Sequence, residues 1–127
     1  MRTDLNRLLG AATTLYSVAI MAKPQWFAKP CGLPLEPDGT TPRGTGALIR
    51  AIGARDTAIG LAMVAATGSR ARRSVTWCRV AADVSDAVVF GSLLDKREPR
   101  LKVAGFALSW AALCALSLRG TQREPHP

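Results

Sequence analysis

Four long runs of apolar residues dominate the chain, and they cover about residues 5–22, 46–67, 74–94 and 101–118. Each run approaches the roughly 20 residues that an α-helix needs to cross a bilayer. Proline or glycine with nearby lysine or arginine follows each run, which is how helices commonly end. The pattern predicts an all-α protein, a bundle of four transmembrane helices that forms a single domain over residues 1–127.

The last run decides between lipid and a protein core as its surroundings. Residues 103–118 contain no charged residue and have no polar face, so the whole circumference of this helix must be covered. A chain of 127 residues is too short to wrap it with three other helices that also need cover. Lipid is therefore the preferred covering, and a soluble four-helix bundle is the alternative that the modest mean hydropathy favours.

The segments between the runs are polar and irregular. Residues 23–45 are rich in proline and glycine and predict an interfacial loop, with Trp26 and Phe27 at the level of the lipid headgroups. Residues 119–127 form a tail. The first run could alternatively be a signal peptide, but "AIMAKP" is a poor cleavage site. Alanine- and arginine-rich composition is typical of GC-rich bacteria, which predicts a multi-pass protein of the bacterial inner membrane.

Net charge and cysteine usage exclude several classes of protein. The formal charge is +8, but the basic residues flank the apolar runs instead of forming a stripe, so we expect the lipid bilayer as partner and no nucleic acid. The three cysteines form no CxxC pair, and the one histidine lies in the tail. We therefore expect no metal and no cofactor. Membrane orientation and oligomeric state stay open.

Charged residues interrupt the second and third runs, where a membrane helix should have none. Their formal charges sum to zero, and each one alone would cost about 2.5–3.5 kcal/mol at the bilayer centre. We therefore expect the two runs to insert as a hairpin in which opposite charges pair at one depth. The six residues are Arg50, Arg55, Asp56, Arg79, Asp83 and Asp86.

Helical spacing indicates how these charges face one another. Arg79, Asp83 and Asp86 share one stripe of a helix. Gly46, Gly53 and Gly60 recur every seven residues and form a bare strip that permits close helix contact. Two interpretations follow and both stay open. The charges are either a salt-bridge network that only holds the helices together, or the lining of a polar chamber for a lipophilic small molecule.

A chamber of this kind would suit acid/base catalysis. Asp83 and Asp86 lie one turn apart in a medium of low dielectric, so one of them should keep its proton at neutral pH. Such a couple could isomerise or cyclise a lipophilic molecule or open its epoxide, while an arginine steadies an oxyanion. A magnesium site at "DVSD" is disfavoured because no second acidic pair follows. The candidate catalytic residues are Asp83, Asp86 and Asp56, and the candidate substrate-binding residues are Arg50, Arg55, Arg79, Tyr16 and Trp110.

Several short motifs also carry a family resemblance. They are "P…A…GLP" from Pro24 to Pro34, "R-x-x-G-x-R-D-x-x-x-G" from Arg50 to Gly60, and an aspartate in the third helix. Over about residues 8–118 the chain resembles a family of small bacterial and fungal four-helix membrane proteins of unknown function, which is DoxX-like in layout. The resemblance implies four spans and no particular reaction. Distant four-helix membrane folds that bind or isomerise sterol-like molecules favour a lipophilic ligand by analogy of fold.

Overall fold

The computed structural model describes residues 2–94 and 97–119, and this part of the chain is helical without any strand. The predicted all-α class is therefore confirmed, and a long helix contains most of each predicted run. Of the predicted tail, all but Arg119 lies outside the described residues. The helices are α1 (Arg2–Ala22), the short α2 (Gln25–Ala28), α3 (Arg43–Ala65), α4 (Ser69–Leu93) and α5 (Arg97–Ser117).

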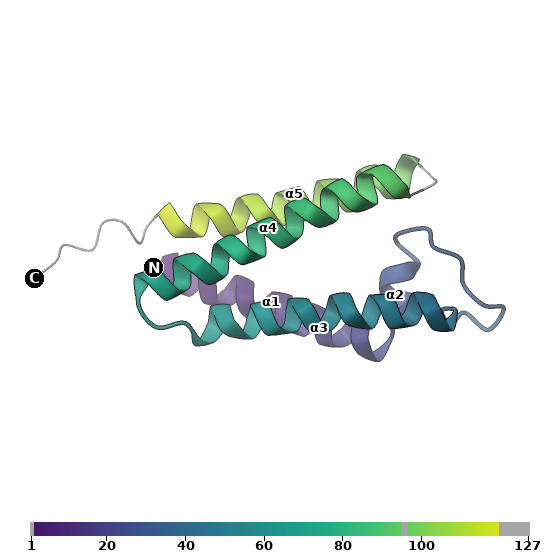
Figure 1. The fold of residues 1–127 in the computed structure, drawn as a ribbon, viewed down its shortest axis with the longest axis horizontal. Helices are drawn as coiled ribbons and strands as arrows, with labels where there is room; N and C mark the ends of the chain where they lie inside the picture. Colours follow the sequence, from purple (N-terminus) through teal and green to yellow (C-terminus); the bar gives the residue numbers. More distant parts are fainter. Residues whose placement is uncertain (1, 95–96, 120–127) are drawn as a thin grey trace, which may run out of the picture.

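The four long helices form two pairs, α1 with α3 and α4 with α5, and contacts between the pairs are much sparser than contacts within them. The pairs lie close together at the end that holds the connection from α3 to α4, and they diverge towards the other end (Figure 1). There α2 and the segment that follows it lie between the two pairs. We call these the narrow end and the wide end.

Glycine brings α1 and α3 into backbone contact. A Cβ atom on Gly60 would lie 2.8 Å from the carbonyl oxygen of Gly10, and one on Gly53 would lie 2.9 Å from that of Ser17. Only a residue without a side chain permits this approach. Gly53 and Gly60 of the predicted glycine strip therefore make the close helix contact with α1, while Arg55 and Asp56 pair with residues of α4.

The second pair is joined by small residues. Ala107, Ala111 and Cys114 recur at helical spacing on the buried face of α5, which lets α4 approach closely along its length. The buried face of α4 is largely polar, with Thr76, Arg79 and Asp83 among its members. Large apolar side chains of α4 such as Val88 and Leu93 are exposed, whereas Val75 and Val80 pack against a buried apolar cluster.

The interior combines apolar side chains such as Ile20, Ile49 and Met63 with buried polar and charged ones. The interior holds Asn6, Ser17, Thr76 and Arg79, which are all at most 2% exposed. The outer surface carries large apolar side chains on every long helix, and Leu15 and Leu93 are 73% and 74% exposed. Arginine is seldom fully buried in soluble proteins unless it is paired.

Among the described residues, α5 alone is long and apolar enough to cross a membrane by length and composition. This helix gives weak support for a membrane location. Charged residues inside α3 and α4 make these two helices less apolar than α5. The arrangement with four spans is therefore a proposal.

Candidate functional site

A cavity of about 280 Å³ lies between the two helix pairs. Its volume is close to the lower end of the range of about 300–1,000 Å³ that is typical of small-molecule sites. The walls are mainly apolar and come from all five helices. The apolar lining includes Ile20, Phe27, Ile52, Phe90, Val103 and Phe106.

Four charged side chains of α3 and α4 line this cavity: Asp56, Arg79, Asp83 and Asp86. Arg55 pairs with Asp56 and Asp86, and we call the five residues together the charged centre. Arg55 crosses from α3 to α4 and donates two hydrogen bonds to Asp86, at 3.2 Å to Oδ1 and 2.7 Å to Oδ2. Its Nε also donates to Oδ1 of Asp56 at 3.0 Å. The bidentate pair locks the register of α3 against α4.

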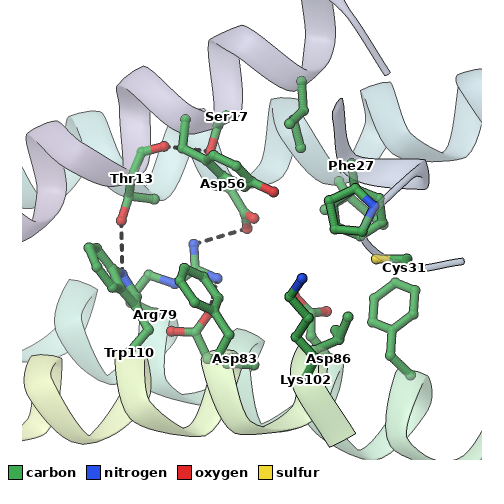
Figure 2. A pocket seen from close by; sticks show the side chains of 18 of the residues that line it. Thr13, Ser17, Phe27, Cys31, Asp56, Arg79, Asp83, Asp86, Lys102 and Trp110 are labelled. Carbon is green, nitrogen blue, oxygen red and sulfur yellow. Dashed lines mark hydrogen bonds and ion pairs between the residues drawn. The ribbon is translucent and has the colours of Figure 1, made fainter. Parts of the chain in front are cut away.

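Arg79 crosses in the opposite direction, from α4 towards α3 (Figure 2). Its Nη2 donates to Oδ1 of Asp83 one turn further along α4, at 2.5 Å. Its Nη1 lies 3.0 Å from Oδ1 of Asp56, although this ion pair lacks the direction of a hydrogen bond. The side chain of Arg79 is only 2% exposed, so the neighbouring carboxylates are what make its burial tolerable.

Arg50 does not join the charged centre. Its exposed side chain donates from Nε to the carbonyl oxygen of Met21 at 3.1 Å. Five residues of helix turn it about 140° away from Arg55, which explains the separation. The expected neutral set of six charges is therefore incorrect in detail. The centre holds two arginines and three aspartates, a formal charge of −1.

Two predicted aromatic residues line the cavity, Tyr16 from α1 and Trp110 from α5. Tyr16 is half exposed. The indole Nε1 of Trp110 donates to Oγ1 of Thr13 at 3.1 Å, which ties α5 to α1 across the space between the pairs (Figure 2). The structure thus brings together Tyr16, Arg55, Asp56, Arg79, Asp83, Asp86 and Trp110 of the predicted site residues.

Several lining residues were not predicted from the sequence. Phe27 was expected at the headgroups, but it packs edge-on against Phe90 with ring centroids 5.6 Å apart and closes the cavity on that side. Trp26, its neighbour, stays exposed beneath the amine of Lys23. Thr13 and Ser17 lie one turn apart on the inner face of α1, and that spacing was the available signal.

A second polar cluster lies towards the narrow end, away from the cavity lining. The amide nitrogen of Asn6 donates to Oγ1 of Thr76 and to Oγ of Ser117, both at 2.9 Å. All three side chains are fully buried, and they come from α1, α4 and α5. We call this the Asn6 cluster. It joins three helices by hydrogen bonds and contains no charged member.

Other reactive groups around the cavity are few. Cys31, which follows α2, lines it, and burial raises the pKa of the Cys31 thiol to about 11. The amine of Lys102 lines the cavity on the side of Asp86 (Figure 2). The described residues contain no group of three histidine, cysteine, aspartate or glutamate side chains arranged to hold a metal ion.

Comparison with known proteins identifies the class of this chain. The family model of a domain of unknown function, DUF4267, matches residues 10–121, and the chain belongs to this family. The predicted resemblance to a family of unknown function is therefore confirmed. No curated protein and no solved structure matched the chain.

Proposed function

We propose that this protein spans a cell membrane with its four long helices and binds a lipophilic small molecule at the charged centre, where it acts on that molecule by acid/base chemistry. The observation that carries the proposal is a set of buried charged and hydroxylated side chains beside a largely apolar cavity. Large apolar side chains are exposed on the outside of every long helix. Ionisable residues inside membrane bundles commonly mark functional sites.

Pairing of the charges supports insertion of α3 and α4 in spite of their low apolarity. Arg55 and Arg79 each contact two aspartates, so the ions of the charged centre are paired. Arg50 of α3 is the exception, because it is exposed and donates to the carbonyl oxygen of Met21. Exposed basic residues lie near the helix ends, Arg70 and Arg73 at the narrow end and Lys29 and Arg43 at the wide end. Such residues suit the two headgroup regions of one bilayer, and we place this bilayer in a bacterial inner membrane.

The cavity offers three features that acid/base chemistry on a lipophilic molecule requires. Apolar walls exclude water and hold the body of the molecule. The carboxyl groups of Asp56, Asp83 and Asp86 lie at one side of the cavity and could take or give a proton. Arginine next to them stabilises negative charge that develops during a reaction. Isomerisation, cyclisation and epoxide opening all fit this set of groups.

A purely structural role is the rival proposal, and the Arg55–Asp86 pair favours it. A bidentate pair between two helices is a device that fixes register without any ligand. In that case the protein would be an accessory membrane component with no turnover, and the cavity would be a space between helix pairs that lipid tails fill.

Two measurements test the proposal. Membrane fractions should retain the protein after a carbonate wash, and detergent should be needed to release it. Protein that stays dissolved without detergent would overturn the four-span arrangement.

Ligand binding is then measured in lipid nanodiscs with Trp26→Phe and Trp77→Phe, which leaves Trp110 as the fluorophore. A lipophilic ketone, 4-bromobenzophenone, should quench Trp110 with saturation. Ala107→Leu should weaken this binding, since Ala107 lines the cavity, whereas Ala112→Leu on the exposed face of the same helix should not. Equal quenching in both variants would contradict a binding site in the cavity.

A further inference from the structure

The charged centre has three carboxyl groups but only two arginines. The hydrogen bonds show which carboxyl group has the fewest partners. Asp86 accepts two hydrogen bonds from Arg55, one on each oxygen. Asp56 lies within 3.0 Å of both arginines. Asp83 accepts one hydrogen bond, on Oδ1.

Oδ2 of Asp83 is buried and has no hydrogen-bond partner. The whole side chain is only 9% exposed. An ionised oxygen in such a place loses its hydration without compensation, which is among the costliest arrangements for a carboxylate. A proton on this oxygen removes the formal charge of −1 and turns an unmatched acceptor into a hydrogen-bond donor.

We propose that Asp83 holds a proton in the resting protein and that the cavity selects lipophilic molecules with a carbonyl oxygen, to which this proton is donated. The inference deepens the proposed function and rests on it for the ligand, while the protonation itself stands on the bonding pattern alone. Asp56 and Asp86 are both paired with arginine, so the proposed proton donor lies beside two further carboxyl groups.

The surroundings of Asp83 bear on any dependence on pH. On its own helix it faces Arg79 and lies one turn from Asp86. The groups that face it from other helices are Arg55 and Asp56 on α3, Cys114 on α5, and, across the cavity, Tyr16 on α1 and Lys102 on α5. Cys114 is fully buried next to Asp83 and carries no charge as a thiol. The cation that α5 contributes to the cavity, Lys102, lies on the side of Asp86, whereas the ion pair of Asp83 is with Arg79.

A carbonyl group matches the donor better than the alternatives do. A protonated Asp83 offers an O–H, and a carbonyl oxygen is an acceptor that brings no further hydrogen in need of a partner. A lipophilic amine would instead require an ionised Asp83. A carbonyl ligand thus requires protonated Asp83 and an amine ligand requires ionised Asp83. Comparing the binding of the two classes therefore tests the protonation state of Asp83.

Infrared spectroscopy in nanodiscs tests the proton without any ligand. The wild-type protein at pH 7 should show the carbonyl stretch of a protonated carboxylic acid, sensitive to isotope labelling of aspartate. Asp83→Asn should abolish this band, whereas Asp4→Asn, at an exposed position near the end of α1, should leave it intact. Absence of the band in the wild type, or its survival in Asp83→Asn, would overturn the assignment.

Competition for Trp110 quenching tests the ligand class with three probes of one shape: benzophenone, diphenylmethane and benzhydrylamine. Benzophenone should displace 4-bromobenzophenone about tenfold better than diphenylmethane, which is the effect of one good hydrogen bond. Asp83→Asn should keep this preference because its amide also donates, and Asp83→Leu should lose it.

The outcomes separate this inference from the proposed function. Tighter binding of benzhydrylamine, lost in Asp83→Asn, would overturn the carbonyl preference while leaving a binding site in place. Failure of every probe to bind would overturn the proposed function, and the infrared band would still decide whether Asp83 carries the proton.

Discussion

The Asn6 cluster and the charged centre are both buried and polar, but they solve the problem of burial differently. In the Asn6 cluster neutral groups from three helices share two hydrogen bonds of 2.9 Å, away from the cavity. In the charged centre, full charges cross between α3 and α4 beside a cavity of about 280 Å³. Neutral hydrogen bonds suffice to hold helices together, so the more costly ions need another reason to be there.

The difference indicates that the two ends of the bundle have different roles, packing at one end and ligand binding at the other. The Asn6 cluster joins the beginnings of α1 and α4 to the end of α5, and the helix pairs meet at that end of the bundle (Figure 1). The cavity lining extends to Phe27 of α2 and Phe90 of α4, towards the end at which the pairs diverge (Figure 1). Packing at one end leaves the other free to admit a molecule. A protein that needed only a stable bundle could have used the arrangement of the Asn6 cluster throughout.

The largest effect is expected where a buried ion loses its partner. Arg79→Met removes the cation between Asp56 and Asp83 and leaves carboxyl groups without compensation. The free energy of unfolding should fall by about 3–5 kcal/mol, measured by denaturant titration in micelles. Arg50→Met serves as the control, since Arg50 is exposed and contacts only a backbone carbonyl; comparable losses in both variants would contradict the distinction between the two arginines.

A change in the distance between α1 and α3 should have the next largest effect on the free energy of unfolding. Both polar regions depend on how closely these helices pack. Gly60→Ala places a Cβ within 2.8 Å of the carbonyl oxygen of Gly10, so α1 and α3 must separate, at a cost of about 1–3 kcal/mol. Gly105→Ala on α5 meets no atom within 4 Å and should stabilise its helix by about 0.5–1 kcal/mol. Thermal unfolding of the two variants gives the comparison, and a stable Gly60→Ala would argue against tight contact.

A smaller effect is expected for the Asn6 cluster. Asn6→Leu keeps the volume but removes hydrogen bonds to Thr76 and Ser117, which in membrane bundles are worth about 1 kcal/mol. Unfolding should become easier by about that amount, while the Kd for 4-bromobenzophenone stays unchanged. A large change in the Kd would show that the two regions are not separate in function.

The smallest effect on stability concerns the edge of the cavity. Burial raises the pKa of the Cys31 thiol to about 11, so its reaction with N-ethylmaleimide in a Cys78→Ser background should be slow at pH 8 and accelerate as the pH rises towards 11. The unfolded chain loses this proton from about pH 9, so the free energy of unfolding should also fall over the same interval. Fast labelling at pH 8 would mean that Cys31 is not buried against the cavity.

Much of the fold was predictable because helices depend on local pattern. The four apolar runs gave the positions of α1, α3, α4 and α5 to within a few residues. The register of α3 against α4 was also predictable in part, since spacing places Arg79, Asp83 and Asp86 on one face of α4. The structure pairs Arg79 and Asp86 with residues of α3, while Asp83 pairs with Arg79. The exclusion of Arg50 was missed because the depth of a residue was considered without its direction around the helix.

Sequence alone thus determined which residues form helices and which charges need partners, because both follow from the spacing of side chains along one chain. Only the tertiary structure decided that the glycines of α3 contact α1, that Phe27 packs against Phe90, and that the helix pairs diverge around a cavity. These features depend on contacts between segments far apart in the chain. Their geometry is set by which surfaces pack most closely, and no local pattern contains that information.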